Sequence, residues 1–381
     1  MDEKITLHIL TTGDPVVWRP ANRSIAVEFA GPRKVLSTSL LNGGYREDLT
    51  GVFNHNCGPD NGSMCELRAH TYLEHLRLVA QDAGLDPARA TGMGTAADMA
   101  NVAIAARCFR ELNVAAIVTG GVEGNGGRAG DPASHYQPGE KTAQHKPGTI
   151  NILLVIDADL PPGTMTRALV TCTEAKTAAL QELMAGSLYS TGLATGSGTD
   201  QTIIVANPTS PLYFEGAGKH NKLGELIGQA VKQAVTEALE KQSGLSPAMQ
   251  HDMLRRFKRY GVTEDTLWRQ YAIAVHNRTL GREQFGDLVR RLAQDSQVVA
   301  RSSLYVHLLD QLQWNLLQPD ETVTMADELL AGVADQYGAN APQAGRGSLG
   351  ECLAAWSTLV VQCVIAQTQA ASLRAVRRAR S

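Results

Sequence analysis

The sequence predicts an α/β or α+β fold, with a sheet of mostly buried strands, flanking helices and glycine-rich loops, followed by a C-terminal all-α extension. Continuous Val/Ile/Leu runs bounded by Gly or Pro recur through the first 240 residues, which is typical of buried strands. Helical patterns alternate with these runs. Beyond residue 242 the glycine-rich loops mostly stop, and Leu and Val recur at the spacing of amphipathic helices.

The strands and helices of the first part follow from these patterns in chain order. Strands are predicted over residues 4–10, 24–30, 34–40, 114–119, 149–157, 167–172 and 202–206. Helices are predicted over residues 66–83, 95–112, 173–185 and 222–241. The helix over 95–112 is favoured by Thr95 with Asp98 three residues on, a pattern that resembles a capping box. The order of the strands in the sheet stays open.

A change in pattern near 242-QSGLSPAMQ-250 predicts two domains, over residues 1–244 and 245–381. The second domain is expected to contain several helices over 247–337, a linker over 338–350 and a last apolar helix. That helix ends in 374-RAVRRAR-380, which is typical of a solvated helix terminus favoured by the helix dipole. The role of this extension stays open, and homo-oligomer formation is one option.

Composition excludes several classes of function. A chain of 381 residues that is 43% hydrophobic can form one large domain or two, and its net charge of −3 predicts no nucleic-acid-binding surface. The start MDEKITLHILTTGD lacks the apolar region of a signal peptide, and the apolar run 353–366 is too short and too polar for a membrane span. The six scattered cysteines are expected to be reduced thiols in a cytoplasm.

The loop 121-GVEGNGGRAGD-131 follows the predicted strand over 114–119. Its glycines form a loose dinucleotide fingerprint, but Asp131-Pro132 follows where that motif requires a helix. A tight turn accounts for the glycines, Gly126 and Gly127 among them. It does not account for Asn125, Arg128 and Asp131.

The polar side chains of this loop favour a ligand site at the carboxyl end of a strand, where α/β sheets usually bind ligands. Arg128 offers a rigid fork of hydrogen-bond donors. Asp131 can orient that fork or act as a base.

A second candidate cluster is 171-TCTEAKTAAL-180. Thr173 is expected to cap a helix, with Glu174 and Lys176 in the first turn. Glu174 suits the positive end of the helix dipole there, whereas Lys176 does not. A residue placed against its local preference often marks a functional site, so both side chains are candidates.

Two further loops carry chemistry. In 194-ATGSGTDQT-202, the hydroxyls (Thr199 among them) can act as nucleophiles if a base such as Asp200 lies near, although Ser and Thr are also common in turns. In 216-GAGKHNKLGELIG-228, Lys219 and His220 can bind an anion or exchange protons. This second loop lacks the spacing of a phosphate-binding P-loop, and an ordinary turn before a helix also explains it.

No metal site is assigned. Glu66, His70 and Glu74 have the spacing of one helix face and resemble a zinc-binding helix, with His55 in a nearby turn. The known two-histidine zinc motifs are absent, so a solvated helix face is the favoured interpretation. Dependence on a divalent metal stays open, and the sequence requires no cofactor.

Seven of these motifs occur together in an order that resembles the adenosylcobinamide amidohydrolases, a family of corrinoid salvage. The motifs are 41-LNGG-44, 92-GMGTAADM-99, 121-GVEGNGGRAGD-131, 148-GTINILL-154, 173-TEAKTAAL-180, 194-ATGSGTDQ-201 and 218-GKHNKLGELIG-228. The resemblance covers roughly residues 5–240. The extension beyond about 245 matches nothing in it.

The resemblance implies hydrolysis of the amide that joins the aminopropanol arm to the corrin ring, which converts adenosylcobinamide to adenosylcobyric acid for cobalamin synthesis. An adenosylated corrinoid is then the substrate, and its cobalt is part of that substrate. Amide hydrolysis needs a base to activate water, donors for the oxyanion and an acid for the leaving amine. The alternative is a carrier or sensor that binds corrinoids without cleaving them.

Candidates for each role come from the motifs, and the choice among them stays open. Asp131, Glu174 or Asp200 can serve as the base, and Lys176, Lys219 or His220 as the acid or oxyanion stabiliser. Substrate binding is expected of Asn125, Arg128, Gly126, Gly127, Thr199 and Lys219.

Overall fold

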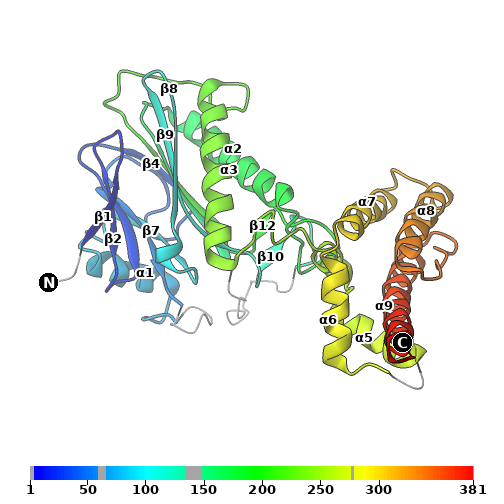
Figure 1. Cartoon of the computed structure of the whole chain (residues 1–381). Coiled ribbons are helices and arrows are strands. Elements are labelled where there is room, and N and C mark those ends of the chain that lie inside the picture. The colour runs from blue at the N-terminus through cyan, green and yellow to red at the C-terminus, as the bar shows by residue number, and fades with distance from the viewer. Residues whose placement is uncertain (1–3, 59–65, 134–147, 276–278, 381) are drawn as a thin grey trace. The chain divides into compact units, whose positions relative to one another are not determined.

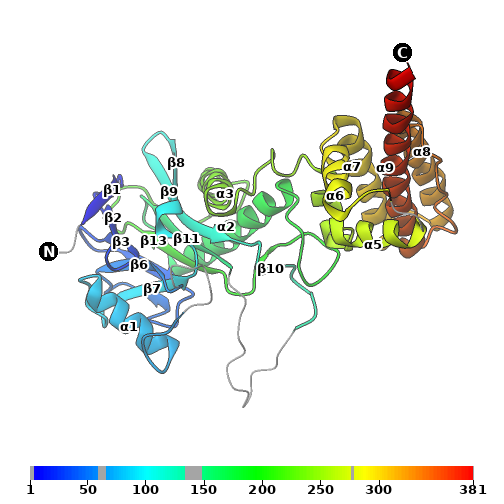
Figure 2. The same ribbon diagram turned by 60° about the horizontal axis from the view of Figure 1, so that its bottom comes forward.

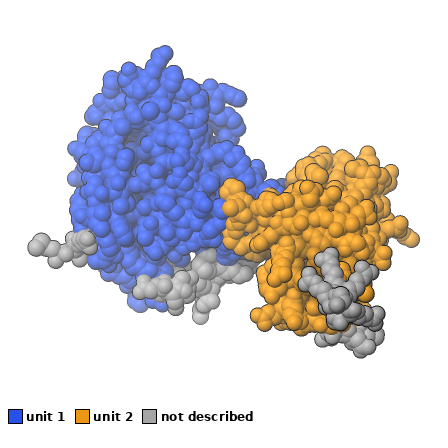
Figure 3. Space-filling model, in the orientation of Figure 1, with its two compact units in different colours: residues 1–246 blue, residues 247–381 orange. Residues whose placement is uncertain are grey.

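The computed structural model describes residues 4–58, 66–133, 148–275 and 279–380, with side chains described as far as residue 373. The chain divides into two compact units, residues 1–246 and 247–381 (Figure 3). The division lies close to the change in sequence pattern near residues 242–250. The fold combines mixed sheets, flanking helices and an all-helical C-terminal region, as predicted.

The two large sheets of unit 1 pack face to face. The first has the order β1-β2-β3-β6-β7, with β1 Ile5–Ile9, β2 Pro15–Arg19, β3 Ser24–Glu28, β6 Gly51–Asn56 and β7 Ala90–Thr95. The second has the order β5-β4-β13-β11-β9-β8, with β5 Gly44–Arg46, β4 Lys34–Ser37, β13 Gln201–Ala206, β11 Thr149–Ile156, β9 Leu112–Gly121 and β8 Ala103–Phe109. One buried cluster joins the two, with Ile25, Val52 and Met93 from the first sheet and Ile117 and Leu153 from the second.

Helices cover both outer faces of this sandwich (Figure 2). α1 (Tyr72–Asp82) packs Leu76 and Val79 against Phe53 of the first sheet. α2 (Pro162–Glu182) and α3 (Lys222–Ser243) pack against each other and against the second sheet. The layers are therefore helix, sheet, sheet and helix pair. A short 3₁₀ turn, η1 (Met99–Asn101), precedes β8.

Unit 2 is a bundle of helices with its own core. Its elements are α4 (Met253–Phe257), η2 (Lys258–Tyr260), α5 (Glu264–Ala274), α6 (Arg282–Ala293), α7 (Ser296–Gln313), α8 (Pro319–Tyr337) and α9 (Leu349–Arg380). Trp356 of α9 is fully buried, with its ring centroid 4.8 Å from those of Phe257 and Tyr305.

Helix α9 extends beyond the apolar run over residues 353–366 at both ends. Over Leu349–Leu373 it is long and apolar enough to cross a membrane by length and composition, with a mean hydropathy of 1.6. The apolar run over 353–366 is therefore part of a longer helix that meets this criterion, and the absence of a membrane span stays a prediction. Trp356, Leu359 and Val364 of the same stretch are buried in the core of unit 2, and a buried core helix meets the same criterion.

The separate cores predict that unit 1 folds without unit 2. We expect residues 1–246 expressed alone to give a soluble protein with a cooperative unfolding transition, because the described core of each unit is built from its own residues. Urea denaturation followed by circular dichroism measures this. An insoluble or non-cooperative fragment would show that residues 247–381 complete the core of unit 1.

Two predicted elements are wrong. Residues 95–112 form η1, β8 and the start of β9 instead of a helix, with a tight hairpin in which Arg110 has φ +53°. Helix propensity is a weak preference that sheet pairing overrides, and the Arg-Glu turn carries no hairpin signal. Residues 167–172 lie inside α2 instead of a strand, because the helix begins at Pro162, a favoured first position.

The predicted helix over 66–83 begins later than expected. Thr71 caps α1 and forms a capping box with Glu74, so Glu66 and His70 precede the helix and share no helix face with Glu74. The zinc-helix pattern is therefore not realised.

The cysteines depart in part from expectation. Cys57 is disulfide-bonded, so the expectation of reduced thiols is wrong for that residue. The four cysteines described as free are Cys108, Cys172, Cys352 and Cys363. Cys65 lies outside the described residues.

Two histidines are buried where α1 meets the first sheet. The ring centroids of His55 and His75 lie 5.4 Å apart, and Nδ1 of His55 lies 3.0 Å from Oγ of Ser24. Burial, with the nearby charge of His75, lowers the pKa of His55 to about 4. Burial also lowers the pKa of His75. Both imidazoles are therefore held neutral in the folded protein.

We expect this pair to make unit 1 less stable in acid. The pKa of His55 is about 4 when folded and about 6.5 when unfolded, so the unfolded chain binds more protons between these values. The stabilisation is complete above about pH 6.5 and is lost as the pH falls toward 4, by on the order of 3 kcal/mol for His55. Urea denaturation of the wild type and of His55→Gln across pH 4–7 measures it. Parallel curves for the two proteins would contradict the prediction.

Candidate active site

Two glycine-rich loops that are far apart in the sequence meet at one end of the second sheet. β10 (Gly126–Gly127) pairs antiparallel with β12 (Gly196–Ser197), and the two strands lie side by side in Figure 1. The amide of Thr195 donates to the carbonyl of Gly127 at 2.9 Å, and the amide of Ala129 donates to Oγ1 of Thr195 at 2.9 Å. The loops over 121–131 and 194–200 therefore form one continuous surface.

Asp131 is held at the edge of this surface by three donors. Its Oδ2 accepts hydrogen bonds from Oγ of Ser187 at 2.6 Å and from the amide of Arg128 at 2.9 Å. Partial burial raises the pKa of Asp131, but hydrogen bonds from Ser187, Ser190 and the Arg128 amide outweigh it, so the pKa lies below its ordinary value. Asp131 is partly exposed and is a carboxylate at neutral pH.

Asn125 and Arg128 contact the turn over residues 186–193. The hydroxyl of Tyr189 donates to Oδ1 of Asn125 at 2.7 Å, and Nδ2 of Asn125 donates to the carbonyl of Gly148 at 3.2 Å. The guanidinium of Arg128 lies over Gly192, where any side chain would collide with it at 2.6 Å. The three polar residues singled out in the 121–131 loop thus all touch one turn.

Lys176 and Asp200 form a largely buried ion pair behind this surface, with side-chain exposures of 11% and 12%. Asp200 also accepts from the amide of Ile150 at 2.8 Å, the amide of Ser197 at 3.0 Å and the hydroxyl of Ser197 at 2.7 Å. Only glycine fits at Gly196, because a Cβ there would meet Lys176 and Asp200. With four donors on it, the Asp200 carboxylate ties α2, β11 and β12 together.

The expectation that Lys176 lies in the first turn of a helix, against the helix dipole, is wrong. Thr173 is not a helix cap: α2 begins at Pro162, and the Thr173 hydroxyl bonds the carbonyl of Leu169 within the helix. Lys176 therefore lies in the second half of α2, where the helix dipole does not oppose a cation. Its buried pairing with Asp200 is what sets it apart.

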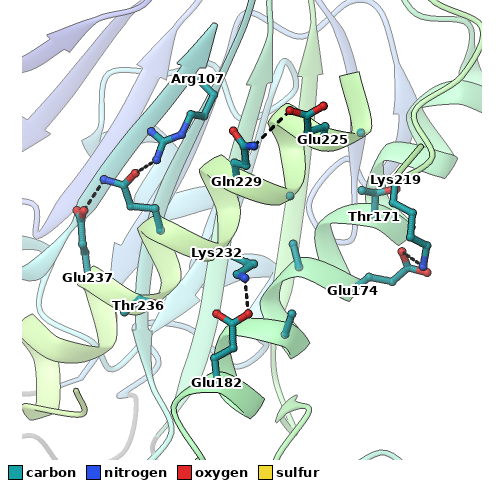
Figure 4. A pocket seen from close by; sticks show the side chains of 15 residues that line it. Arg107, Thr171, Glu174, Glu182, Lys219, Glu225, Gln229, Lys232, Thr236 and Glu237 are labelled. Atoms are coloured by element: carbon teal, nitrogen blue, oxygen red, sulfur yellow. Dashed lines mark hydrogen bonds and ion pairs between the residues drawn. The ribbon is translucent and has the colours of Figure 1, made fainter. Parts of the chain in front are cut away.

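Glu174, Lys219 and His220 lie apart from this cluster. Side chains two positions apart on a helix point in nearly opposite directions, so Glu174 faces away from Lys176. Glu174 pairs with Lys219 at 3.2 Å on the wall of a groove of about 850 Å³ between α2 and α3 (Figure 4). His220 is exposed beside Lys219. The predicted catalytic residues therefore form two groups. The first group lies at the glycine-rich loops and contains Asp131, Lys176 and Asp200, and the second group contains Glu174, Lys219 and His220. The catalytic role of each residue stays a prediction.

Thr199 joins the first group through backbone contacts. Its hydroxyl donates to the carbonyl of Gly148 at 3.1 Å, and its own carbonyl accepts from the Thr149 hydroxyl at 2.7 Å. These bonds hold the start of β11 against the 194–200 loop.

A polar cluster between the two sheets was not predicted. Asn151 donates to Oδ1 of Asn54 at 2.8 Å and to the carbonyl of Gly94 at 3.1 Å, and Asn54 donates to Oγ1 of Thr119 at 2.7 Å. Within the part of the chain that the structure describes, the buried Oδ1 of Asn151 has no hydrogen-bond partner. Asparagines that interrupt the apolar runs 51-GVFNHN-56 and 149-TINILLVI-156 are the signal that could have found this cluster.

Ser187 and Tyr189 were also not predicted. They lie in the turn 186-GSLYSTGL-193, which reads as an ordinary loop because Gly and Ser are common in turns.

The described part of the chain contains no group of three or more His, Cys, Asp or Glu side chains arranged to hold a metal ion.

The first group has the parts that acyl chemistry requires. A carboxylate, Asp131, borders solvent and can accept a proton from water. The Arg128 guanidinium, exposed in the same surface, is a cation that can stabilise an oxyanion. The arrangement suits hydrolysis of a neutral acyl bond at an open surface.

Residues 10–247 match the family described as adenosylcobinamide amidohydrolase. The chain is 35% identical over 231 residues to a Methanocaldococcus jannaschii protein titled "Uncharacterized protein MJ1613", covering 58% of this chain and 87% of that protein. The PH0078 protein of Pyrococcus horikoshii OT3 aligns over 62% of this chain and 82% of its own, with 13% identity and a TM-score of 0.30.

Proposed function

Because this chain belongs to the adenosylcobinamide amidohydrolase family, we propose that it hydrolyses the amide between the aminopropanol arm and the corrin ring of adenosylcobinamide. The products are adenosylcobyric acid and the free aminopropanol part. The observation that carries the proposal is the family match over residues 10–247, which spans every loop of the candidate site.

The geometry of the first group supports this reaction. Asp131 is anionic and partly exposed, so it can take a proton from the attacking water. As water adds to the carbonyl carbon, negative charge builds on the carbonyl oxygen, which the exposed Arg128 guanidinium can stabilise. The leaving amine then needs a proton, which Asp131 can return after accepting it from water.

The second group, which contains Glu174, Lys219 and His220, takes no part in the proposed reaction. Glu174 and Lys219 neutralise each other in the groove between α2 and α3, on the outer face of the helix layer. A contribution from them would require the substrate to reach that groove. We therefore assign the chemistry to the Asp131 surface.

Incubation of the purified full chain with adenosylcobinamide, followed by mass spectrometry, tests the proposal. Adenosylcobyric acid should appear in proportion to enzyme and time, with divalent ions and with a chelator run in parallel to decide metal dependence. Tight binding of the corrinoid with no product under either condition would instead support the carrier or sensor function. Neither binding nor product would reject both.

A further inference from the structure

The turn over residues 186–193 exposes two large apolar side chains beside Asp131. Leu188 is 42% exposed and Tyr189 is 41% exposed. Apart from the partly buried Leu193, the rest of the turn is small or polar, with glycine, serine or threonine at 186, 187, 190, 191 and 192. Neither side chain is needed to fill the core of unit 1.

Hydrogen bonds hold this turn in one conformation. The amide of Leu188 donates to the carbonyl of Gly126 in β10 at 2.9 Å, and the amide of Ser187 donates to the carbonyl of Gly192 at 2.9 Å. The amide of Tyr189 donates to Oγ of Ser187 at 3.0 Å. The backbone of both apolar residues is therefore fixed on the glycine strand that borders the site.

The ring of Tyr189 is fixed as well. Its hydroxyl donates to Asn125, whose side chain is buried and itself bonded to Gly148. One edge of the ring lies over Gly127, where a Cβ would come within 3.3 Å of it. An exposed aromatic ring that is already immobilised loses little conformational entropy when a ligand covers it.

The backbone of Tyr189 and the carboxylate of Asp131 share one hydrogen-bond partner. Ser187 Oγ donates to Oδ2 of Asp131 at 2.6 Å and accepts from the Tyr189 amide, so one hydroxyl links the two residues. An apolar surface next to a polar group that can act on an amide is the pattern of a site for a large apolar ligand with polar arms.

We propose that Leu188 and Tyr189 form the surface on which the corrin macrocycle rests, so that the amide-bearing arm reaches Asp131. This inference rests on the proposed function. The macrocycle is broad and rich in apolar carbon, its adenosyl group stands on one face, and its amide-bearing arms project from the rim. Contact with a fixed aromatic ring buries apolar area on both sides and sets the distance from the ring to the arm.

Ligand binding to four single variants tests the surface: Tyr189→Ala, Leu188→Ala, Tyr189→Phe and a control, Tyr213→Ala. Tyr213 is a matched control, since it is 56% exposed and its backbone bridges to Asp159, beyond the far end of β11 from Gly148. The eight residues of β11 separate those ends by about 25 Å.

Equilibrium dialysis with adenosylcobinamide gives Kd, and mass spectrometry gives kcat and KM. Tyr189→Ala should raise Kd and KM about tenfold with kcat changed less than about threefold, and Leu188→Ala should act in the same direction. Tyr189→Phe keeps the ring and should stay within about threefold, and Tyr213→Ala should match the wild type.

Wild-type Kd in both alanine variants, or a loss of kcat with unchanged Kd, would overturn the proposed surface while the proposed function stands. If the wild type binds adenosylcobinamide without cleaving it, the proposed function fails and the Kd values still decide the surface. If the wild type binds no corrinoid, both fail. Circular dichroism of each variant confirms that it is folded.

Discussion

Asp131→Asn should lower kcat/KM for adenosylcobinamide by about 10²–10⁴-fold, the range that general acid–base groups contribute. The asparagine oxygen can still accept from Ser187 and from the Arg128 amide, so the loop keeps its hydrogen bonds. Because the side chain is partly exposed, the free energy of unfolding should change by less than about 1 kcal/mol. Steady-state kinetics and thermal denaturation of the same preparation measure the two effects.

The pH profile adds an independent check. The pKa of Asp131 lies below its ordinary value of 3.8, so the carboxylate stays ionised across the neutral range. If it takes the proton from water, the acid limb of kcat/KM in the wild type should lie below about pH 4 and be absent in any residual activity of Asp131→Asn.

Glu174→Gln is the matched control for this experiment. It makes the same carboxylate-to-amide change in the α2–α3 groove, where the side chain is 42% exposed and pairs with Lys219. We expect it to keep turnover within about threefold of the wild type. Wild-type kinetics in Asp131→Asn together with a large loss in Glu174→Gln would place the chemistry in the groove instead.

Lys176→Met should reduce the free energy of unfolding of unit 1 by about 3 kcal/mol or more, because it leaves the Asp200 carboxylate buried without its cation. For a unit of this size the Tm should fall by roughly 6–12 °C. Urea denaturation and thermal denaturation followed by circular dichroism measure the change.

The double variant Lys176→Met with Asp200→Asn separates structure from catalysis. It removes both charges together, so it should recover at least half of the stability lost in the single variant. If Lys176→Met is as stable as the wild type, the pair does not hold the loops together. If Asp200→Asn is fully stable yet inactive, Asp200 takes part in the reaction and does more than tie α2, β11 and β12 together.

Much of the fold could be predicted where local patterns are strong. The continuous apolar run over 149–157 became β11, and the amphipathic pattern over 222–241 became α3 with Asn221 as its cap. The prediction of a helix over 95–112 was wrong. Much of this alanine-rich segment forms β8, whose pairing with the neighbouring strand β9 stabilises it, and local helix propensity does not indicate such pairing.

The sequence predicted which loops carry the candidate site, but it did not predict which of their side chains lie close together. Asp131, Arg128 and Asn125 were identified from residue types in a glycine loop. Ser187 and Tyr189, which bond Asp131 and Asn125, carry no local signal. Glu174 and Lys176 looked like one cluster because they are neighbours in sequence. The helix separates them, since two residues turn a side chain by about 200°.

By itself, the sequence determined the family, the mixed α/β class and the loops that carry the chemistry, because ordered motifs and apolar periodicity are local properties of the chain. The tertiary structure alone decided that β10 pairs with β12, that Lys176 turns inward to Asp200, and that Glu174 turns outward to Lys219. Those outcomes depend on the residue at which α2 begins and on which strands pair with each other. Both are settled by packing between segments far apart in the chain, which no local pattern records.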